Sequence, residues 1–394
     1  MTQRSIDIAI VGGGLVGALL AKLLSKLNFK IILLEKQFLP AASAEGEPVI
    51  DRRALALNFG TLSLLKKLLH FDAASLGAVV QHIMISDQGG FGRVELDANA
   101  EHLPYFGAVI PITLLTRTLQ QSVFDDNNIQ CIEGECSALL ENPHAVEVEV
   151  NNAHTNEVYQ AKLVIGADGA ASKIRELLNI SAVTHNYEQS ALIGNVKIEG
   201  LHAHTAFERF TREGPLALLP LDAEHMTLVW VMTNKHAAIR QRLPEAILLQ
   251  DLQDLMGFRA GRFVNVGATS LYPLKQVLAE KTYVGRVGIL GNAAHSIHPV
   301  AAQGFNLSVR DVLGLYQTLK RCQGDYSAPK DIWQEYIEVR RHDQQRTIRL
   351  TDTLLKVFGH GSKVAALTRD TLMLGLELMP WCKEELNEIM VGVH

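Results

Sequence analysis

The sequence predicts an α/β protein in which a Rossmann-like domain is interleaved with a sheet-rich second domain and followed by a helical C-terminal tail. Three observations support this fold class. The chain opens on a strand, a glycine turn, a helix and a second strand within about 30 residues, as a βαβ unit requires. Alternating apolar residues fill much of the middle, and helical periodicity dominates from residue 304 onward. Strands that alternate with helices are typical of a parallel sheet covered by helices.

Length and composition bound the fold and argue against one class of function. The 394 residues are long for one compact domain and comfortable for two, and 47% hydrophobic residues suffice for a large core. The net charge is −5, and the Lys and Arg residues are scattered along the chain. Nucleic-acid binding usually requires a basic stripe or patch, so we expect no nucleic-acid partner.

The cysteines and the apolar runs of the sequence indicate in which cellular compartment the protein is expected. Cys131, Cys136, Cys322 and Cys382 show no regular spacing and no C-x-x-C pattern, which is typical of buried thiols in a reducing compartment. The N-terminal apolar run leads straight into a glycine turn, unlike a signal peptide. No run reaches the roughly 18 apolar residues of a membrane span. The expected location is cytoplasmic, at most peripheral to the inner membrane.

The first half of the chain begins with a strand over residues 6–11, a helix over 18–27 and a strand over 30–35. A helix with one buried face is expected over 53–68. Residues 79–97 alternate like two strands around a Gly-Gly turn. Amphipathic spacing predicts a helix over 112–126, and strand-like runs follow at 129–139, 145–150 and 157–165.

The second half is strand-rich over 191–233, helical over 244–258 and strand-like again over 281–290. This order indicates that the two domains are interleaved along the chain. The expected Rossmann-like domain comprises residues 1–75, 105–182 and 280–345. The sheet-rich domain comprises 76–104 and 183–279, and the C-terminal helical region comprises 346–394.

The motif GGGLVG lies between the first strand and the first helix. Gly12 permits the tight turn, Gly14 lets the backbone approach a pyrophosphate, and Gly17 permits close packing of helix on strand. A helix N-terminus favours phosphate, and Glu35 at the end of the second strand suits the hydroxyls of an adenosine ribose. The motif predicts a dinucleotide site without distinguishing FAD from NAD. The alternative is a structural glycine turn.

A second motif, GADG, places Asp168 in a turn between a strand and a helix that Ser172 opens. Taken alone, this motif is better explained by an Asp-Gly turn with a helix cap than by a binding site.

A third motif, GNAAHSIHPV, raises the question of a metal, because His295 and His298 are three residues apart. A metal would need further ligands, and the chain has no H-E-x-x-H pattern and no Cys/His cluster. Loop histidines hydrogen-bonded to the backbone are therefore the favoured interpretation, and no metal is expected. A turn and helix start flanked by glycine instead suit a group that becomes negative, such as the edge of a reduced flavin.

Taken in this order, GGGLVG with Glu35, GADG and GNAAHSIHPVAAQGFN resemble the FAD-dependent aromatic hydroxylases, the single-component flavoprotein monooxygenases. Within them the chain is most similar to the ubiquinone-biosynthesis hydroxylases, in particular the 2-polyprenyl-6-methoxyphenol hydroxylase branch. The stretches DRRALALN, ISDQGGFG and AFERFTREGPLALLP share this resemblance, which covers nearly the whole chain. One departure is Asn292, where most of the wider family has Asp. An amide keeps an acceptor oxygen and adds a donor, and it is typical of this branch.

The resemblance implies an FAD/NAD(P)-binding domain, a substrate domain formed by the sheet-rich parts, and roles for individual residues. Gly12, Gly14, Gly17 and Glu35 would hold the ADP half of FAD, with Leu15, Val16 and Lys36 completing that unit. Arg53 would reach the FAD phosphates, the alternative being a surface charge or ion pair. Asp168 would touch the pyrophosphate region, and Gly291 and Asn292 the ribityl chain. Pro299, Gly304, Phe305 and Asn306 would lie along the isoalloxazine.

The implied reaction is hydroxylation of a polyprenylated methoxyphenol. NAD(P)H, a transient reductant, would reduce FAD, O₂ would form a C4a-hydroperoxyflavin, and the ionised phenol would attack it. Because the cofactor carries this chemistry, no catalytic side chain is assigned from the sequence. Three alternatives stay open: a hydroxylase of another aromatic compound, a flavin reductase or dehydrogenase, and a non-catalytic FAD-binding subunit of a ubiquinone biosynthetic complex.

The C-terminal region combines apolar stripes with several basic residues. Such a helix can lie on a membrane or receive a partner protein, as a lipid substrate would favour. Packing against the cofactor domain is the preferred interpretation, because helical apolar stripes usually face a core.

Overall fold

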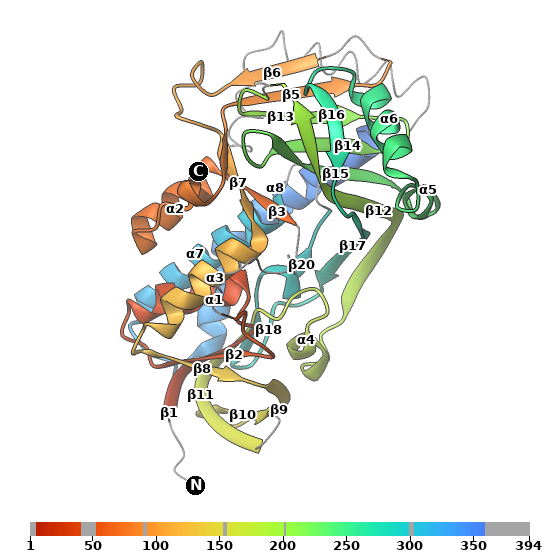
Figure 1. Cartoon of the computed structure of the whole chain (residues 1–394). Helices are drawn as coiled ribbons and strands as arrows, with labels where there is room; N and C mark the ends of the chain where they lie inside the picture. The colour runs from red at the N-terminus through yellow and green to blue at the C-terminus, as the bar shows by residue number, and fades with distance from the viewer. Residues whose placement is uncertain are drawn as a thin grey trace.

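The computed structural model describes residues 5–40, 53–89, 93–152, 156–200, 202–298 and 303–358. In this part of the chain the strands form an eight-stranded, a nine-stranded and a three-stranded sheet. The two large sheets lie at opposite ends of the molecule, with α1, α3 and α7 beside the first (Figure 1). This arrangement confirms the predicted α/β fold class.

The eight-stranded sheet has the parallel core that the opening motif predicts. β1 (Ser5–Val11) pairs in parallel with β2 (Ile31–Glu35) and β11 (Asn156–Gly166), and β8 (Ile129–Glu133) pairs with β2. Ile8, Ala9 and Ile10 are fully buried because helices cover one face and strands cover the other. The covering helices are α1 (Leu15–Ser25), α3 (Ile112–Phe124) and α7 (Gln303–Cys322), and the covering strands are β9 (Glu135–Glu141) and β10 (Val146–Asn151).

The nine-stranded sheet is mostly antiparallel, and its two faces have different neighbours. One face packs on α5 (Asn234–Arg240) and α6 (Glu245–Met256) around the fully buried Trp230. The other face looks toward the first sheet. Its strands are β5 (His82–Asp87), β6 (Arg93–Asp97), β12 (Ala182–Glu199), β13 (Thr205–Phe210), β14 (Pro215–Pro220), β15 (His225–Thr233), β16 (Arg262–Val266), β17 (Ser270–Ala279) and β20 (His295–Ser296).

A three-stranded sheet joins the two large ones and corrects one prediction. Residues 54–58, expected to be helical, form β3 (Ala54–Asn58), which pairs with β7 (Gly107–Pro111); β4 (Ala78–Val80) pairs with β7 on its other side. The alternating sequence ALALN suits a strand once a partner is available. The helix begins one residue later as α2 (Phe59–Leu69), because the Asn58 side chain accepts a hydrogen bond from Thr61 N at 2.9 Å. A 3-10 turn, η1 (Ala73–Leu76), follows α2.

Two further runs are divided where one strand was expected. The run at 129–139 splits into β8 and β9 at Gly134, which has φ +158°. The run at 281–290 is the hairpin β18 (Tyr283–Val284) and β19 (Val287–Ile289), which turns at Gly285 with φ +54°. Positive φ is accessible to glycine at little cost, so both breaks fall where the backbone can turn.

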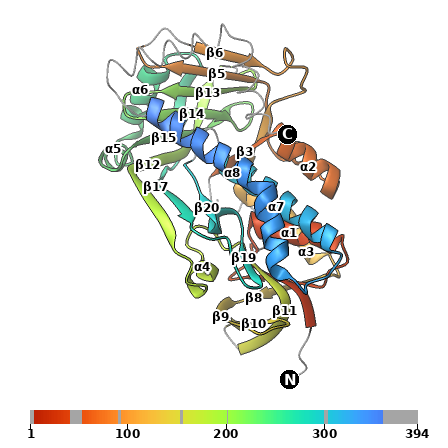
Figure 2. The ribbon, with the colours of Figure 1, turned by 180° about the vertical axis from the view of Figure 1, so that it is seen from behind.

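The chain then returns to helices. α4 (Lys173–Leu177) follows β11, η2 (Gly291–Ala293) follows β19, and α8 (Pro329–Phe358) runs obliquely past both large sheets (Figure 2). Gln276 of β17 donates a hydrogen bond to Asp352 of α8 at 3.1 Å, which ties α8 to the second sheet. Residues 359–394, most of the expected C-terminal helical region, lie outside the described residues. Within the described ranges, no helix has the length and hydropathy that crossing a membrane requires.

Three of the four cysteines are described, and all three are free thiols. Cys136 is buried, which raises its pKa to about 12, and Cys131 and Cys322 are partly buried. Cys382 lies outside the described residues.

Candidate functional site

A cavity of about 1530 Å³ lies between the carboxyl edge of the first sheet and the inner face of the second. Drug-sized ligands usually occupy roughly 300–1,000 Å³, so this cavity is large enough for a dinucleotide and a second molecule together. One end is formed by the glycine turn and the ends of β1, β2 and β11. The other end is formed by apolar side chains of β5, β12, β14 and β15.

The glycine turn has the geometry of a phosphate-binding site. Gly12 has φ +106°, and a Cβ there would lie 2.5 Å from the carbonyl oxygen of Ala167. A Cβ on Gly17 would lie 1.7 Å from the carbonyl oxygen of Gly12. By contrast, a Cβ on Gly14 would meet no atom within 4 Å, since this residue faces the cavity at the N-terminus of α1. A ligand phosphate can therefore approach the backbone of Gly14 and the free N–H groups of the helix.

Glu35 ends β2 at the cavity wall. Its Oε2 accepts a hydrogen bond from Gly13 N at 2.5 Å, and its Oε1 accepts one from Lys36 N at 3.0 Å. Burial raises the pKa of Glu35 above its ordinary value, and these backbone hydrogen bonds oppose the rise. Two backbone donors thus orient the carboxylate, whose remaining lone pairs suit ribose hydroxyls.

Replacing Glu35 with glutamine is expected to weaken FAD binding about tenfold to a hundredfold, since hydrogen bonds to charged groups contribute about 1.5–3 kcal/mol. Equilibrium titration of the apoprotein with FAD would measure this change. The matched control is Glu133→Gln: Glu133 is the register partner of Glu35 on β8 and is not part of the cavity wall. Equal FAD affinities of the two variants would contradict the role given to Glu35.

Gln120 on α3 supports the glycine turn, and sequence reasoning missed it. Its Nε2 donates to the carbonyl oxygen of Gly13 at 2.8 Å, and its Oε1 accepts from Leu39 N at 3.0 Å. The side chain is buried among the apolar residues of its helix, including Leu119 and Val123. A polar residue within the apolar stripe of a helix was the available signal, because buried amides require partners.

Asp168 and the helix start beside it form the next part of the wall. Asp168 Oδ2 accepts from Ile174 N at 3.0 Å, whereas its buried Oδ1 has no hydrogen-bond partner among the described residues. Ser172 caps α4 as predicted, by accepting from Arg175 N at 3.0 Å. Arg175 donates to the carbonyl oxygen of Ala293 at 2.9 Å and so joins this motif to the third one. The unpartnered acceptor of Asp168 is an observation that a bound ligand with a donor group would explain.

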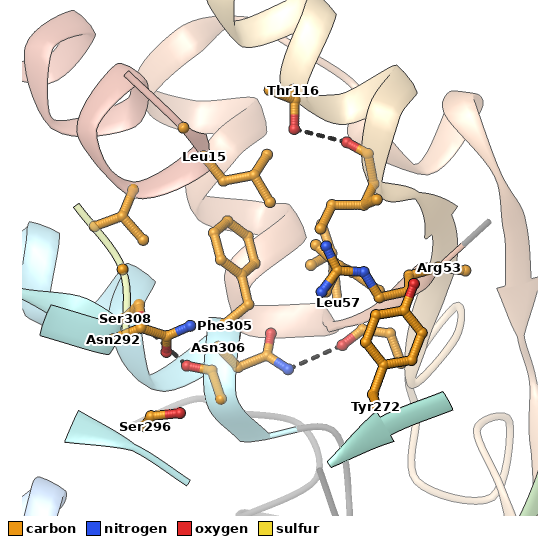
Figure 3. A pocket seen from close by; sticks show the side chains of 18 of the residues that line it. Leu15, Arg53, Leu57, Thr116, Tyr272, Asn292, Ser296, Phe305, Asn306 and Ser308 are labelled. Atoms are coloured by element: carbon orange, nitrogen blue, oxygen red, sulfur yellow. Dashed lines mark hydrogen bonds between the residues drawn. The ribbon is translucent and has the colours of Figure 1, made fainter. Parts of the chain in front are cut away.

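The third motif turns at Gly291, which has φ +57°, and presents Asn292 to the cavity. Gly304 and Phe305 lie at the start of α7 in the same wall, where Phe305 and Leu15 border one space (Figure 3). Asn306 is held firmly: its Nδ2 donates to Ala56 O at 3.0 Å and its Oδ1 accepts from Asn58 N at 3.1 Å. Asn306 therefore fixes α7 against β3.

His295 and His298 belong to the same loop, but their side chains do not line the cavity. His295 is buried and its Nε2 pairs with Asp311 Oδ2 on α7. His298 packs edge-on against Tyr187 with ring centroids 5.0 Å apart, and burial lowers its pKa to about 4. The described residues contain no group of three His, Cys, Asp or Glu side chains arranged to hold a metal ion. The two histidines support the loop through packing and a hydrogen bond, and the partner of His295 is the side chain of Asp311, not the backbone expected from the sequence.

Arg53 stacks over the ring of Tyr272, with its guanidinium carbon 5.0 Å from the ring centroid, and both residues line the cavity (Figure 3). Arg53 immediately precedes β3, so the contact joins the three-stranded sheet to β17 of the nine-stranded sheet. The expected contact of Arg53 with the FAD phosphates stays a prediction.

The structure brings most of the expected cofactor-binding residues into one wall. These are Gly12, Gly14, Leu15, Val16, Glu35, Lys36, Arg53, Asp168, Asn292, Gly304, Phe305 and Asn306. Gly17 and Gly291 do not line the cavity but pack closely behind its wall. Pro299 lies outside the described residues. The contacts of these side chains with a bound cofactor remain a prediction.

Comparison with known proteins assigns the family. The model of the family described as FAD binding domain matches residues 5–351. The chain is 30% identical over 348 residues to 3-demethoxyubiquinol 3-hydroxylase of Escherichia coli, covering 88% of this chain and 86% of that protein. It is 30% identical over 374 residues to ubiquinone hydroxylase UbiL of Rhodospirillum rubrum, covering 93% and 85%.

Among solved structures, p-nitrophenol 4-monooxygenase PnpA of Pseudomonas putida has the same fold, with a TM-score of 0.79, 17% identity and complete coverage of both chains. An FAD fits the residues present: Gly14 opens on the cavity, Glu35 is oriented at the end of β2, and Asp168 offers an unpartnered acceptor. The chain therefore belongs to the FAD binding domain family, as one of its FAD-dependent monooxygenases.

Proposed function

We propose that this chain hydroxylates the ring of a polyprenylated methoxyphenol in ubiquinone biosynthesis, with NAD(P)H as the reductant and O₂ as the oxygen source. The observation that carries the proposal is the continuity of the cavity, which joins the FAD-binding motifs to an apolar wall on the second sheet. The similarity to ubiquinone-biosynthesis hydroxylases over most of the chain supports the same substrate class.

The wall on the second sheet suits a hydrocarbon chain. It is formed by aliphatic side chains of four strands: Ile83, Ile85, Ala191, Ile193, Ala217, Leu219, Val229 and Val231. Burial of apolar surface contributes about 25 cal/mol per Å², so a polyprenyl chain would gain affinity from each isoprene unit that contacts this wall. A small polar aromatic substrate would leave the same surface without a partner.

Some residues of the cavity wall would bind the cofactor, and others would bind the substrate. FAD, when bound, would take a hydride from NAD(P)H and activate O₂ for transfer of one oxygen atom to the ring. Asn292 and the start of α7 would hold the flavin end of the cofactor, and Phe305 would border the space where the substrate ring enters. The aliphatic strands would keep water away from the reacting atoms.

The proposal includes the domain assignment made from the sequence. Residues 1–75, 105–182 and 280–345 would form the FAD-binding domain, and residues 76–104 and 183–279 the substrate domain. The enzyme would work in the cytoplasm, at the surface of the inner membrane or within a complex of ubiquinone-biosynthesis proteins, because its substrate carries a lipid tail.

Deletion of the gene followed by mass spectrometry of the accumulated quinone precursor would test the function. The expected result is accumulation of a prenylated methoxyphenol that lacks one hydroxyl group, and restoration of ubiquinone by the wild-type gene. Unchanged ubiquinone would contradict the proposal. Isotopically labelled O₂ should place one labelled atom in the product, which separates a hydroxylase from a flavin reductase or dehydrogenase.

An Asn292→Ala variant addresses the remaining alternative, a non-catalytic FAD-binding subunit. We expect this variant to fail to restore ubiquinone, since it removes the amide presented to the flavin end of the cavity. Full complementation by the variant would favour the structural subunit.

A further inference from the structure

Among the described residues, the apolar wall of the substrate end of the cavity contains one carboxylate, Glu208 on β13. Its register partners are Ala217 on β14 and Ile85 on β5, and both line the cavity beside it. Glu208 is therefore placed in the middle of a wall whose neighbouring strands present aliphatic side chains. Glu208 is partly buried, and a carboxylate in an apolar wall without a charge partner on the neighbouring strands is costly to maintain, which makes it a candidate for a function.

No cation of the neighbouring strands compensates Glu208. β14 carries no charged residue, and Asp87 at the end of β5 interacts with Arg209, which also donates to Ser86 Oγ at 3.1 Å. In the described part of the cavity wall, the other titratable groups are Tyr272 and Arg53, which stack on each other, and the residues of the nucleotide end. Desolvation alone raises the pKa of Glu208 to about 7.

We propose that Glu208 is a catalytic residue that accepts a hydrogen bond, and then the proton, from the ring hydroxyl of the substrate. This inference rests on the proposed function, and it goes beyond that function by naming the group that ionises the substrate. The O–H bond of the phenol breaks, its electron pair stays on the oxygen, and the proton moves to a carboxylate oxygen of Glu208. The phenolate ring is the better nucleophile toward the activated oxygen. When the ring carbon that received the oxygen loses its hydrogen as a proton to solvent, the ring becomes aromatic again and Glu208 returns its proton to the original ring oxygen.

The chemistry of the site fits this role in two respects. The site must present a polar group to the ring hydroxyl and an apolar surface to the rest of the substrate, and β13 with its neighbours does both. Proton transfer is most effective when the base has a pKa near the working pH, and burial brings Glu208 toward that range. An exposed carboxylate would be a much weaker base for a phenol.

The test compares Glu208→Gln with wild-type holoenzyme in hydroxylation of a short-chain 2-prenyl-6-methoxyphenol. Glutamine keeps the shape and a hydrogen-bond acceptor but cannot take the proton. We expect kcat for product formation to fall about a hundredfold, the usual range for loss of an acid–base group, with little change in FAD content. The wild-type rate should rise with pH through about 7, and the variant should lack this rise.

Two comparisons separate a proton acceptor from a structural residue. An otherwise identical substrate with fluorine next to the ring hydroxyl ionises more readily, so it should lose much less rate in the variant. Glu208→Asp should retain part of the rate. Glu199→Gln is the matched control, because Glu199 is an exposed carboxylate on β12 of the same sheet. Equal losses with both substrates, or a normal rate and pH profile in Glu208→Gln, would overturn the proposal.

A binding experiment keeps this test independent of the proposed function. 4-Nitrophenol changes its absorption on ionisation, and difference spectra with the oxidised holoenzyme, recorded as the pH is raised through about 7, follow the ionisation of the bound probe. We expect the phenolate band to appear at lower pH with wild type and Glu199→Gln than with Glu208→Gln, because the ionised carboxylate can take the proton of the probe. Absence of the wild-type band, or its appearance at the same pH in all three proteins, would overturn the role of Glu208 even if the natural substrate is a different phenol.

Stability against pH provides a check on the environment of Glu208. Its pKa in the folded protein, about 7, is above the ordinary value of 4.5, so the folded state binds the proton more tightly than the unfolded state. The contribution of Glu208 to the free energy of unfolding is therefore present at low pH and is lost as pH rises from 4.5 through about 7. Glu208→Gln should melt at a higher temperature than wild type above pH 7, and the difference should disappear as pH falls toward 4.5. Parallel melting curves at every pH would show that Glu208 is not desolvated.

Discussion

A Gly17→Ala variant is expected to lose both its FAD and a large part of its folding stability. The added Cβ would lie 1.7 Å from the carbonyl oxygen of Gly12, much less than van der Waals separation. Either α1 must move away from β1 or the turn that carries Gly12 must change its path. Strain of this kind in a packed region costs about 3 kcal/mol. Thermal melting and the flavin content of the purified protein would measure the two losses.

Gly14→Ala is the control that separates steric strain from loss of the binding surface. Gly14 has φ −70°, which alanine adopts without strain, and its Cβ would meet no protein atom within 4 Å. We therefore expect a wild-type melting temperature for the apoprotein of this variant, together with weaker FAD binding because the methyl group enters the cavity. A Gly17→Ala protein that retains stoichiometric FAD and melts like wild type would show that the turn does not have the packing described here.

The parts of the site that could be predicted from the sequence are those formed by residues close together in the chain. Gly12, Gly14 and Gly17 lie in one turn, and Glu35 follows within the same βαβ unit. Their spacing therefore carries most of the geometry. The Ser172 cap was predictable for the same reason, since the groups that it joins are three residues apart.

The parts that could not be predicted depend on contacts between distant segments. Gln120 reaches the glycine turn from α3, which is more than a hundred residues further along the chain. Arg53 finds Tyr272 only because β3 and β17 meet across the cavity. Glu208 becomes a lone carboxylate in an apolar wall through pairing of β13 with β5 and β14, and its local sequence looks like an ordinary amphipathic strand. β3 was misread because its pairing partner β7 is distant in sequence.

The second large effect is expected at Asp311 on α7, which contacts His295 in the loop of residues 291–298, here called the cofactor loop. Its side chain is fully buried; Oδ1 accepts from Arg340 Nε at 2.8 Å and from Gln344 Nε2 at 2.9 Å, and Oδ2 pairs with His295. Asp311→Asn leaves the guanidinium of Arg340 buried with one ion-pair partner fewer. Breaking a buried ion pair in this way costs about 3–5 kcal/mol, so we expect a marked fall in the free energy of unfolding.

The same substitution should also loosen the cofactor loop, because His295 follows Asn292 by three residues and is held by Asp311. Chemical denaturation and FAD release would show both effects in Asp311→Asn. The control, Asp331→Asn, changes an exposed aspartate in the first turn of α8 and should cost less than about 1 kcal/mol with unchanged FAD release. Equal stability of the two variants would contradict the role of Asp311.

The pH dependence of the Asp311 effect identifies its electrostatic origin. Burial opposes ionisation of Asp311, but the charges and hydrogen bonds of His295 and Arg340 outweigh it and lower its pKa below the ordinary 3.8. Because the pKa of Asp311 is lower in the folded than in the unfolded protein, its stabilising effect is complete above the unfolded-state pKa. The effect is lost as pH falls through the folded-state pKa. The stability difference between wild type and Asp311→Asn should therefore be largest near neutral pH and shrink below about pH 4. A difference that stays constant into acid would mean that Asp311 acts through packing alone, and the cofactor loop would then be held by the shape of α7 and not by its charge.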